Sequence, residues 1–386
     1  MTSTHASRPL SVRPISTPQH LDFIRSRPSV SFLQTPAWAK VKAEWRGQSI
    51  GWFDSDVLVG TALVLYRQLP KLQRFLAYLP EGPDIDWFDG RLDDWLTPLM
   101  THLRSQGAFG IRMGPPVVMR RWNAATIKQA IADPVLASLT DVPADASDEA
   151  ALGLRQSLTA LGWKELATKG GFSAGQPKFN FQIPLASTGA DGTRVQRTED
   201  EILAGMNQLW RRNIKKAAKL GVQVRVGTRD DLPDFHRIYA ETAERDHFTP
   251  RPRSYFERMW DALNAEEPDR ILLYLAHHEG DLVAATTMVR VGEHAWYSYG
   301  ASTTAKREVR GSNAIQWQMI RDARAAGATI YDMRGITETL DPDDPHVGLI
   351  QFKVGTGGEA VEYLGEWDLP LNRALYLGFT TYLRRR

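Results

Sequence analysis

The chain contains no cysteine and no long apolar run. Without cysteine there can be no disulfide bond and no cysteine-ligated zinc or iron–sulfur centre. No apolar segment approaches the roughly 18 residues of a membrane-spanning helix, and Met1–Pro14 lacks the apolar core of a secretory signal. These absences favour the cytoplasm, and we expect a cytoplasmic protein.

Net charge is also small, because 47 lysines and arginines oppose 45 acidic residues and leave a formal charge of +2. Binding to a polyanion would therefore require a local concentration of basic residues. A hydrophobic fraction of 42%, with 12 Trp, 14 Phe and 11 Tyr, indicates a globular protein. A length of 386 residues predicts two domains, each with its own core.

Such a concentration occurs in the segment LWRRNIKKAAKLG, residues 209–221. Helical spacing places an apolar stripe on one side of this segment, made of Trp210, Ile214, Ala217, Ala218 and Gly221. The opposite side carries the cations Arg211, Arg212, Lys215, Lys216 and Lys219. This pattern fits either a solvated charged face or a surface that binds phosphates.

A second basic residue follows in a constrained setting. Arg251 lies between Pro250 and Pro252 and precedes Tyr255 and Phe256. Because proline restricts the backbone on both sides, we expect Arg251 to be held in place, which favours an anion-binding function for this region.

Near the start of the chain, Thr35-Pro36 predicts the beginning of another helix. Trp38 and Trp45 recur at helical spacing, and Lys42 falls among them while Lys40 falls on the far side. Lys42 therefore either extends past the edge of the core or points into a cleft, and Lys40 is expected at the surface.

The order of predicted elements is the same in both halves: helices, an antiparallel meander of strands, then a helix that crosses back to a further strand. In the second half the meander is predicted at Ile271–His277, Leu282–Val291 and Ala295–Tyr299, and the crossing helix at Asn313–Ala326. This order predicts an α/β (α+β) fold with two tandem acetyltransferase-like (GNAT-like) domains and a cleft between them. We expect residues 1–178 plus 365–386 to form an acceptor-binding domain, and residues 179–364 to form a transfer domain that faces the donor.

Six segments, in order, carry a family resemblance: FLQTPAWAKVK, RRNIKKAAKLGV, FTPRPRSYF, WYSYGAS, YDMRGI and GLIQFKVGTGGEAVEYLGEWDLP. Together they resemble the Fem family over nearly the whole chain. The family consists of aminoacyl-tRNA-dependent transferases that build the interpeptide bridge of peptidoglycan. Some members carry a long helical hairpin in the second domain; this chain resembles the shorter type without it.

The resemblance implies roles for individual residues. Lys42 and Arg251 match residues that hold the diphosphate of the precursor. Tyr255, Tyr297 and Tyr299 match residues that line the acceptor channel, and the five cations of segment 209–221 are expected to contact tRNA. Lys353 matches a lysine at the reacting carbonyl.

One position departs from the family pattern. Some relatives have an aspartate at the end of the strand that here reads FGIRMGPP, where this chain has Gly114. That carboxylate therefore cannot act as a base. Phe109, in place of a family aromatic residue, lacks a hydroxyl.

The expected aminoacyl transfer requires few catalytic groups from the protein. An aminoacyl ester is already activated, so attack by an amine needs positioning, a neutral nucleophile and stabilisation of the developing oxyanion. Lys353 suits the oxyanion, although a surface lysine is the alternative. Tyr297 and Tyr299 should point to the same face of a strand, and ordinary sheet packing is the alternative for them. Asp332 is interpreted as structural or as amine-binding.

Competing hypotheses concern the donor and catalysis itself. An acyl-CoA-dependent N-acetyltransferase would need a glycine-rich pyrophosphate loop, but the nearest segment, Arg307–Ser312, has one glycine. A non-catalytic module that binds tRNA or membrane could use the basic segment and the terminal LGFTTYLRRR.

We expect aminoacyl-tRNA as co-substrate and no further cofactor. The expected donated residue is glycine, alanine or serine, and the expected acceptor is lipid II or UDP-MurNAc-pentapeptide. We also expect a monomer that associates peripherally with the inner face of the membrane.

Overall fold

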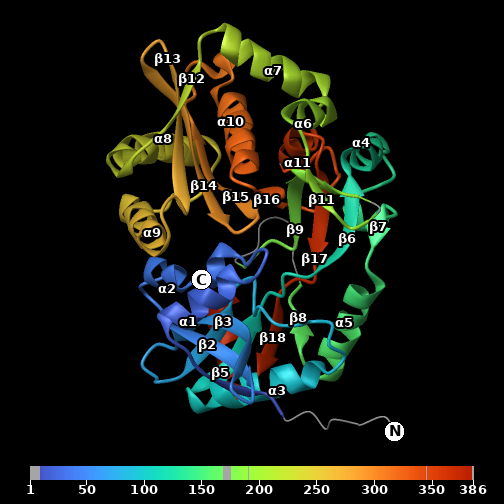
Figure 1. The fold of residues 1–386 in the computed structure, drawn as a ribbon, viewed down its shortest axis with the longest axis vertical. Coiled ribbons are helices and arrows are strands. Elements are labelled where there is room, and N and C mark those ends of the chain that lie inside the picture. The colour runs from blue at the N-terminus through green and yellow to red at the C-terminus, as the bar shows by residue number, and fades with distance from the viewer. Residues whose placement is uncertain (1–8, 168–174, 190, 345, 385–386) are drawn as a thin grey trace.

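A computed structural model describes residues 9–167, 175–189, 191–344 and 346–384. The described chain forms two main β-sheets, each flanked by helices, with the first sheet in the lower half of Figure 1 and the second in the upper half. We refer to the two sheets with their helices as the first and second halves.

The first sheet has the strand order β1-β2-β3-β4-β5-β18-β8. Strands β1 to β4 run antiparallel to one another, and β4 pairs with β5 in parallel after the chain has crossed through α3. The strands are β1 (Ser11–Pro14), β2 (Arg46–Asp54), β3 (Val57–Gln68), β4 (Phe75–Leu79), β5 (Ala108–Met113), β8 (Lys164–Glu165) and β18 (Trp367–Pro370). The helices of this half are α1 (Thr17–Arg25), α2 (Pro36–Val41), α3 (Leu92–Ser105), α5 (Glu149–Ala160) and α12 (Arg373–Arg384).

The second sheet has the order β12-β13-β14-β15-β16-β9-β17-β6-β7. Its antiparallel meander β12 to β15 is followed by α10 and by the parallel strand β16. The strands are β6 (Val118–Asn123), β7 (Ala146–Ser147), β9 (Phe179–Pro184), β12 (Gln223–Val226), β13 (Ile271–His278), β14 (Asp281–Val291), β15 (His294–Ser302), β16 (Ile330–Ile336) and β17 (Glu359–Tyr363). The helices are α4 (Ala124–Ala132), α6 (Glu199–Gly205), α7 (Gln208–Lys219), α8 (Leu232–Arg245), α9 (Arg253–Glu266), α10 (Gly311–Ala325) and α11 (Val347–Val354), beside a small ribbon of β10 (Ala186–Thr188) and β11 (Arg194–Gln196).

The sheets divide the chain differently from the predicted domains at residues 118–147. These residues were predicted in the first domain, but they form strands β6 and β7, and β6 pairs with β17 while β7 pairs with β6 in the second sheet. The chain changes sheets directly after β5, at Gly114-Pro115-Pro116, because proline has no N–H with which to continue a ladder. It returns to the first sheet at β8, and again at β18, which pairs with β5.

Direct contacts join the two halves. Helix α2 packs against α9, and the carboxylate of Glu266 accepts a hydrogen bond from the backbone N–H of Ala37 at 2.7 Å. On the same side, the N–H of Glu293 donates to the carbonyl of Pro28 at 2.9 Å. These contacts fix α2, and the residue that follows it, against the second half.

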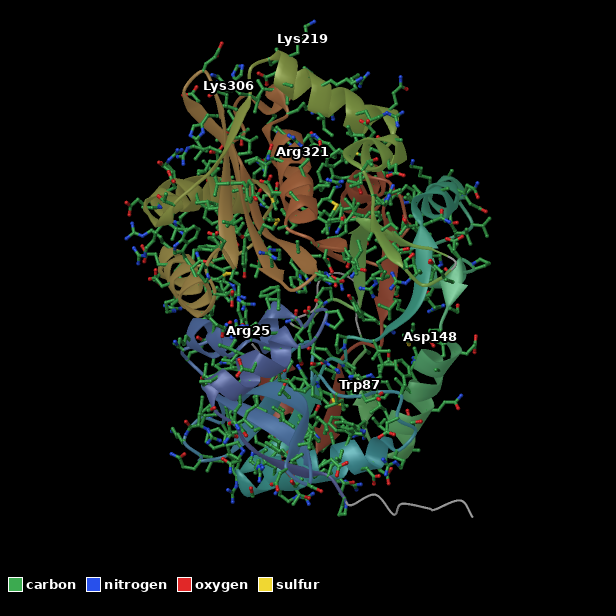
Figure 2. The ribbon with its side chains drawn as sticks, in the orientation of Figure 1. Arg25, Trp87, Asp148, Lys219, Lys306 and Arg321 are labelled. Carbon is green, nitrogen blue, oxygen red and sulfur yellow. The ribbon has the colours of Figure 1, made fainter. Side chains whose placement is uncertain are left out.

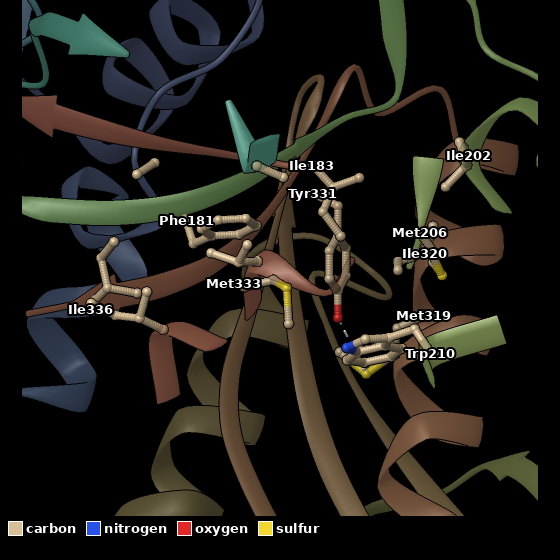
Figure 3. Close-up of a cluster of buried hydrophobic side chains, with 14 of the residues drawn as sticks. Phe181, Ile183, Ile202, Met206, Trp210, Met319, Ile320, Tyr331, Met333 and Ile336 are labelled. Carbon is tan, nitrogen blue, oxygen red and sulfur yellow. Dashed lines mark hydrogen bonds between the residues drawn. The ribbon is translucent and has the colours of Figure 1, made fainter. Parts of the chain in front are cut away.

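The core of the second half holds α7 against the sheet. Trp210 of α7 is 3% exposed and packs with Met319 of α10 and Tyr331 of β16 (Figure 3). Helix α7 packs along α10 through its apolar stripe, but two predicted members of that stripe are exposed: Ala218, and Gly221, which lies beyond the end of the helix. No helix in the described part of the chain is long and apolar enough to cross a membrane.

Candidate functional site

Lys42 and Arg251 come from different halves and meet at one tyrosine. The Nζ of Lys42 lies 5.6 Å from the ring centroid of Tyr255, and the guanidinium carbon of Arg251 lies 5.2 Å from the same centroid. Burial, and then the nearby Arg251 charge, lower the pKa of Lys42. Neither cation forms an ion pair within the described residues. Two unneutralised cations beside one aromatic ring are a candidate site for an anion.

Local structure explains the position of each cation. The predicted helix included Lys42 and continued to Trp45, but α2 ends at Val41, so Lys42 is its C-cap; the side chain is still half-buried beside Trp38. Lys40 is exposed, as predicted. Arg251 directly precedes the Pro252 cap of α9, and Nε2 of His236 lies 3.1 Å from its carbonyl oxygen. The backbone of Arg251 is therefore tethered, while its side chain is exposed.

The prediction that Tyr297 and Tyr299 share one face of a strand is wrong. A bulge in β15 leaves Met288 opposite Tyr297 and Thr287 opposite Tyr299, so Ser298 is an extra residue. Tyr297 therefore packs in the core of the α10 side, whereas Tyr299 packs on the opposite side with Tyr255. The Tyr299 hydroxyl donates to that of Tyr255 at 3.2 Å. Only Tyr255 and Tyr299 join the cation pair, and burial raises the pKa of Tyr297 to about 12.

A cavity of about 900 Å³ lies between the two sheets. Its lining includes Trp87 from the first half, labelled in Figure 2, and Asp332 from the second. None of the predicted site residues lines it. Phe32 separates it from the cation pair, because this ring packs edge-on against both Trp38 and Trp296.

Several carboxylates line this cavity, with fewer arginines. The carboxylates are Glu81, Asp84, Asp86, Asp148, Asp332 and Glu366, and the arginines are Arg27, Arg121 and Arg334. The excess of acidic groups favours a ligand with a positive charge, such as an amine. The side-chain oxygen Oδ1 of Asn180 also faces no hydrogen-bond donor among the described residues, although Asn180 is only 2% exposed. A peptide N–H would satisfy it.

Asp332 organises the second-half wall of this cavity. Its carboxylate accepts from the side chain of Gln182 at 3.0 Å and lies 3.3 Å from Nε2 of His294. Burial alone would raise the pKa of Asp332, but the contact with His294 and the neighbouring positive charge of Arg334 lower it. The other oxygen accepts the N–H of Arg334, which has φ of 64°. Asp332 therefore stabilises an unusual left-handed turn of the strand, which supports the structural interpretation.

Lys353 lies directly behind that turn. It is 4% exposed in α11, and its Nζ donates to the carbonyls of Arg334 at 3.1 Å and Gly335 at 2.7 Å. Burial lowers the pKa of Lys353 to about 7. In its ammonium form the lysine has three protons, so these two bonds leave one without an acceptor among the described residues. Lys353 is thus a buried residue that fixes the backbone of the cavity wall, and not the surface lysine of the alternative hypothesis.

Sequence reasoning missed the group that lies beside Gly114. The Glu366 carboxyl lines the cavity and accepts the hydroxyl of Tyr78 at 2.6 Å. A Cβ added at Gly114 would lie 3.5 Å from the Cγ of Glu366, so the carboxyl is next to the position where some relatives have aspartate. Burial raises the pKa of Glu366, so its carboxylate is a stronger base than that of an ordinary glutamate. The only signal in the sequence was its place in the GEWDLP segment.

Arg211 differs from the other four cations of helix α7. The guanidinium of Arg211 donates to the carbonyls of Ala204 and Met206, so it closes the end of α6. The remaining cations, Arg212, Lys215, Lys216 and Lys219, are exposed and form no ion pair within the described residues. Figure 2 shows Lys219 pointing outward at the far end of the second half.

Helix α7 is also joined to the helix that carries Lys353. The indole N–H of Trp210 donates to the carbonyl of Phe352 at 2.8 Å, and the two rings lie 4.8 Å apart. The N–H of Asn207 donates to Gly355 at the other end of the same turn. No group of three or more potential metal ligands occurs among the described residues.

The fold defines a two-lobed protein of the acetyltransferase-like class, with a candidate anion site and an acidic cavity where its lobes meet. The FemAB family matches residues 15–281 and 274–384, and the chain belongs to this family. Between α7 and Arg251 the structure has β12, a short 3₁₀ turn (Arg229–Asp231) and α8, which confirms the type without a helical hairpin.

Relatives and solved structures agree with this assignment. The chain is 25% identical to "Lipid II:glycine glycyltransferase" of Staphylococcus saprophyticus and 24% identical to that of Staphylococcus aureus, with 94% of this chain and 93% of each relative covered. The crystal structure of FemX superposes with a TM-score of 0.77 at 24% identity, over 95% of this chain and 99% of that chain. The structure of L-PGS from Bacillus licheniformis has a TM-score of 0.52 at 10% identity, over 96% and 97% of the two chains. These two structures confirm the fold.

Proposed function

We propose that the protein transfers an amino acid from aminoacyl-tRNA to an amino group of the stem peptide of a peptidoglycan precursor, and so builds the interpeptide bridge. The observation that carries the proposal is the meeting of Lys42 and Arg251 at Tyr255. A diphosphate is an anion of the size that two cations on one ring can share. The names of the staphylococcal relatives favour lipid II as the acceptor and glycine as the donated residue.

The acidic cavity is where we place the acceptor peptide. Its carboxylates attract the ammonium form of the acceptor amine, and Glu366 can take the proton that must leave before the nitrogen attacks. The nitrogen then forms a bond to the ester carbonyl carbon, and the bond from that carbon to the ribose oxygen of tRNA breaks. The leaving oxygen takes up a proton.

We assign Lys353 to the developing oxyanion, through the proton that its two carbonyl contacts leave free. The exposed cations of α7 would bind the phosphates of the tRNA. The activated ester makes a further cofactor unnecessary, and a monomer contains both halves of the site. We place the reaction in the cytoplasm, at the inner face of the membrane.

The test is direct. The purified protein is incubated with a charged tRNA pool and either lipid II or UDP-MurNAc-pentapeptide, and the products are weighed by mass spectrometry. We expect the acceptor to gain one aminoacyl residue. A gain with acetyl-CoA and none with charged tRNA would refute the proposal and favour the N-acetyltransferase hypothesis.

A further inference from the structure

One end of the first sheet carries basic residues that have no ionic partner. They come from the start of β2, the hairpin between β3 and β4, and the start of α12: Arg46, Arg67, Lys71, Arg74 and Arg373. None of them forms an ion pair with a described residue. The segments Tyr66–Leu79 and Leu371–Arg386 contain no aspartate or glutamate. We call this set the basic end.

Packing brings these segments together. The guanidinium carbon of Arg67 lies 5.5 Å from the ring centroid of Phe379 in α12 and 5.6 Å from that of Trp45. Phe379 packs with Leu69 and Leu76 of the hairpin region in one small apolar cluster. The hairpin, α12 and the start of β2 therefore form a continuous surface.

The same surface exposes apolar side chains. Leu72, at the hairpin tip, is 48% exposed, and Leu377, on α12, is 68% exposed. The outward side of α12 has no charge along one stripe, which consists of Ala374, Leu377, Gly378 and Thr381. A helix side that faces only water is usually charged, so this stripe fits an apolar partner.

The basic end is adjacent to the anion site. Lys42 precedes Trp45 and Arg46 by a few residues in one short segment, and Arg67 packs on Trp45. A lipid-linked acceptor keeps its diphosphate at the level of the lipid headgroups. The surface beside Lys42 must then face the membrane.

We propose that the basic end, with Leu72 and Leu377, docks on the surface of a membrane that contains anionic lipid. The inference rests on the proposed function in one respect, the lipid-linked acceptor. Phosphate headgroups neutralise the arginines and Lys71, and the two leucines enter the interface below them. RNA offers similar phosphates but gives exposed leucines nothing to enter. Helix α7 lies at the far end of the second half (Figure 1), so a tRNA on α7 leaves the basic end free.

The experiment measures sedimentation of the full-length protein with vesicles of phosphatidylcholine, with or without phosphatidylglycerol. We expect binding only when phosphatidylglycerol is present. The variant Lys71→Glu with Arg74→Glu should bind at least about twentyfold more weakly, since each basic residue near such a surface contributes about 1 kcal/mol, or roughly fivefold. The variant Leu72→Ser with Leu377→Ser should also bind more weakly. The control Lys215→Glu with Lys216→Glu on α7 should bind as the unmodified protein does.

Two readouts separate the alternatives. Unchanged thermal unfolding of the variants shows that lost binding is not lost folding, and transfer to the soluble UDP-linked acceptor should be unchanged in both variants of the basic end. If these variants lost tRNA affinity and kept vesicle binding, the surface would bind RNA and the inference would be wrong. Failure of the transfer assay overturns the proposed function alone, because vesicle binding is measured without acceptor.

Discussion

Removal of either cation of the anion site should weaken binding of the acceptor through its diphosphate. Lys42 is half-buried and has no ionic partner, so its contact with a phosphate replaces an unfavourable state in which burial and Arg251 already lower its pKa. A charge-assisted contact of this kind is worth about 1.5 to 3 kcal/mol, or about ten- to a hundredfold in affinity. We expect Lys42→Ala near the upper figure.

Arg251→Ala should cost less. Its guanidinium is exposed, and an exposed ionic contact is screened by water, so we expect a loss near tenfold. Arg251→Lys should recover only part of that loss, because an ammonium lacks the planar fork of a guanidinium.

The assay is titration calorimetry with UDP-MurNAc-pentapeptide and with the same muropeptide without its diphosphate. Both variants should bind the phosphate-free ligand as the unmodified protein does. Lys40→Ala is the matched control, because Lys40 is exposed two residues away on the same helix. Equal losses in Lys40→Ala and Lys42→Ala, or equal losses with both ligands, would refute the reasoning.

Three further predictions concern other regions. Lys353→Met should lower the rate of transfer by about a hundred- to a thousandfold with little change in acceptor affinity; if only thermal stability fell, the lysine would merely support the turn at Arg334. Replacement of Lys215, Lys216 and Lys219 by glutamate should weaken tRNA binding and reduce the dependence of its affinity on salt concentration. An unchanged salt dependence would show that α7 is only a solvated face. His20 is fully buried with a pKa lowered from 6.5 to about 4. The folded state disfavours the charged form of His20. Its contribution to the free energy of unfolding is therefore complete above pH 6.5, and about 3 kcal/mol of it is lost as the pH falls toward 4. Urea unfolding across this range should show a shallower decline for His20→Gln than for the control His236→Gln, and parallel curves would contradict the assignment.

The sequence was most informative where one local pattern decides the outcome. Helical spacing separated Lys42 from Lys40 and the stripe of α7 from its cations, because a helix phase depends only on neighbouring residues. Strand alternation gave the wrong faces for Tyr297 and Tyr299. Alternation holds only while a strand is regular, and the bulge at Ser298 is visible only in the pairing with β14. Arg211 was assigned with the other cations, although its reach to α6 places it elsewhere.

The acidic cavity illustrates a second limit. Residues that line it, such as Glu81, Asp332 and Glu366, are separated in the sequence and come together only because the two sheets lie next to each other. The change of sheet at Gly114-Pro115-Pro116 was also unpredictable, because the proline run ends β5 without specifying which sheet receives β6. The family resemblance indicated candidate site residues by their positions in the sequence, but only the strand pairing shows which side chains lie next to them.

The contact of Trp210 with α11 has a consequence for the length of tRNA that the second half could accept. The indole N–H of Trp210 donates to the carbonyl of Phe352, the residue before Lys353, and so joins the outer helix α7 to the helix that carries this lysine. If tRNA binds α7 as we propose, the length of its acceptor arm must match the distance from α7 to Lys353, because a shorter or longer arm would place the aminoacyl ester away from this lysine. Such selection of tRNA by length requires no contact with its bases. A smaller side chain in place of Trp210 would weaken the contact between α7 and α11 without removing a group that contacts tRNA or acceptor.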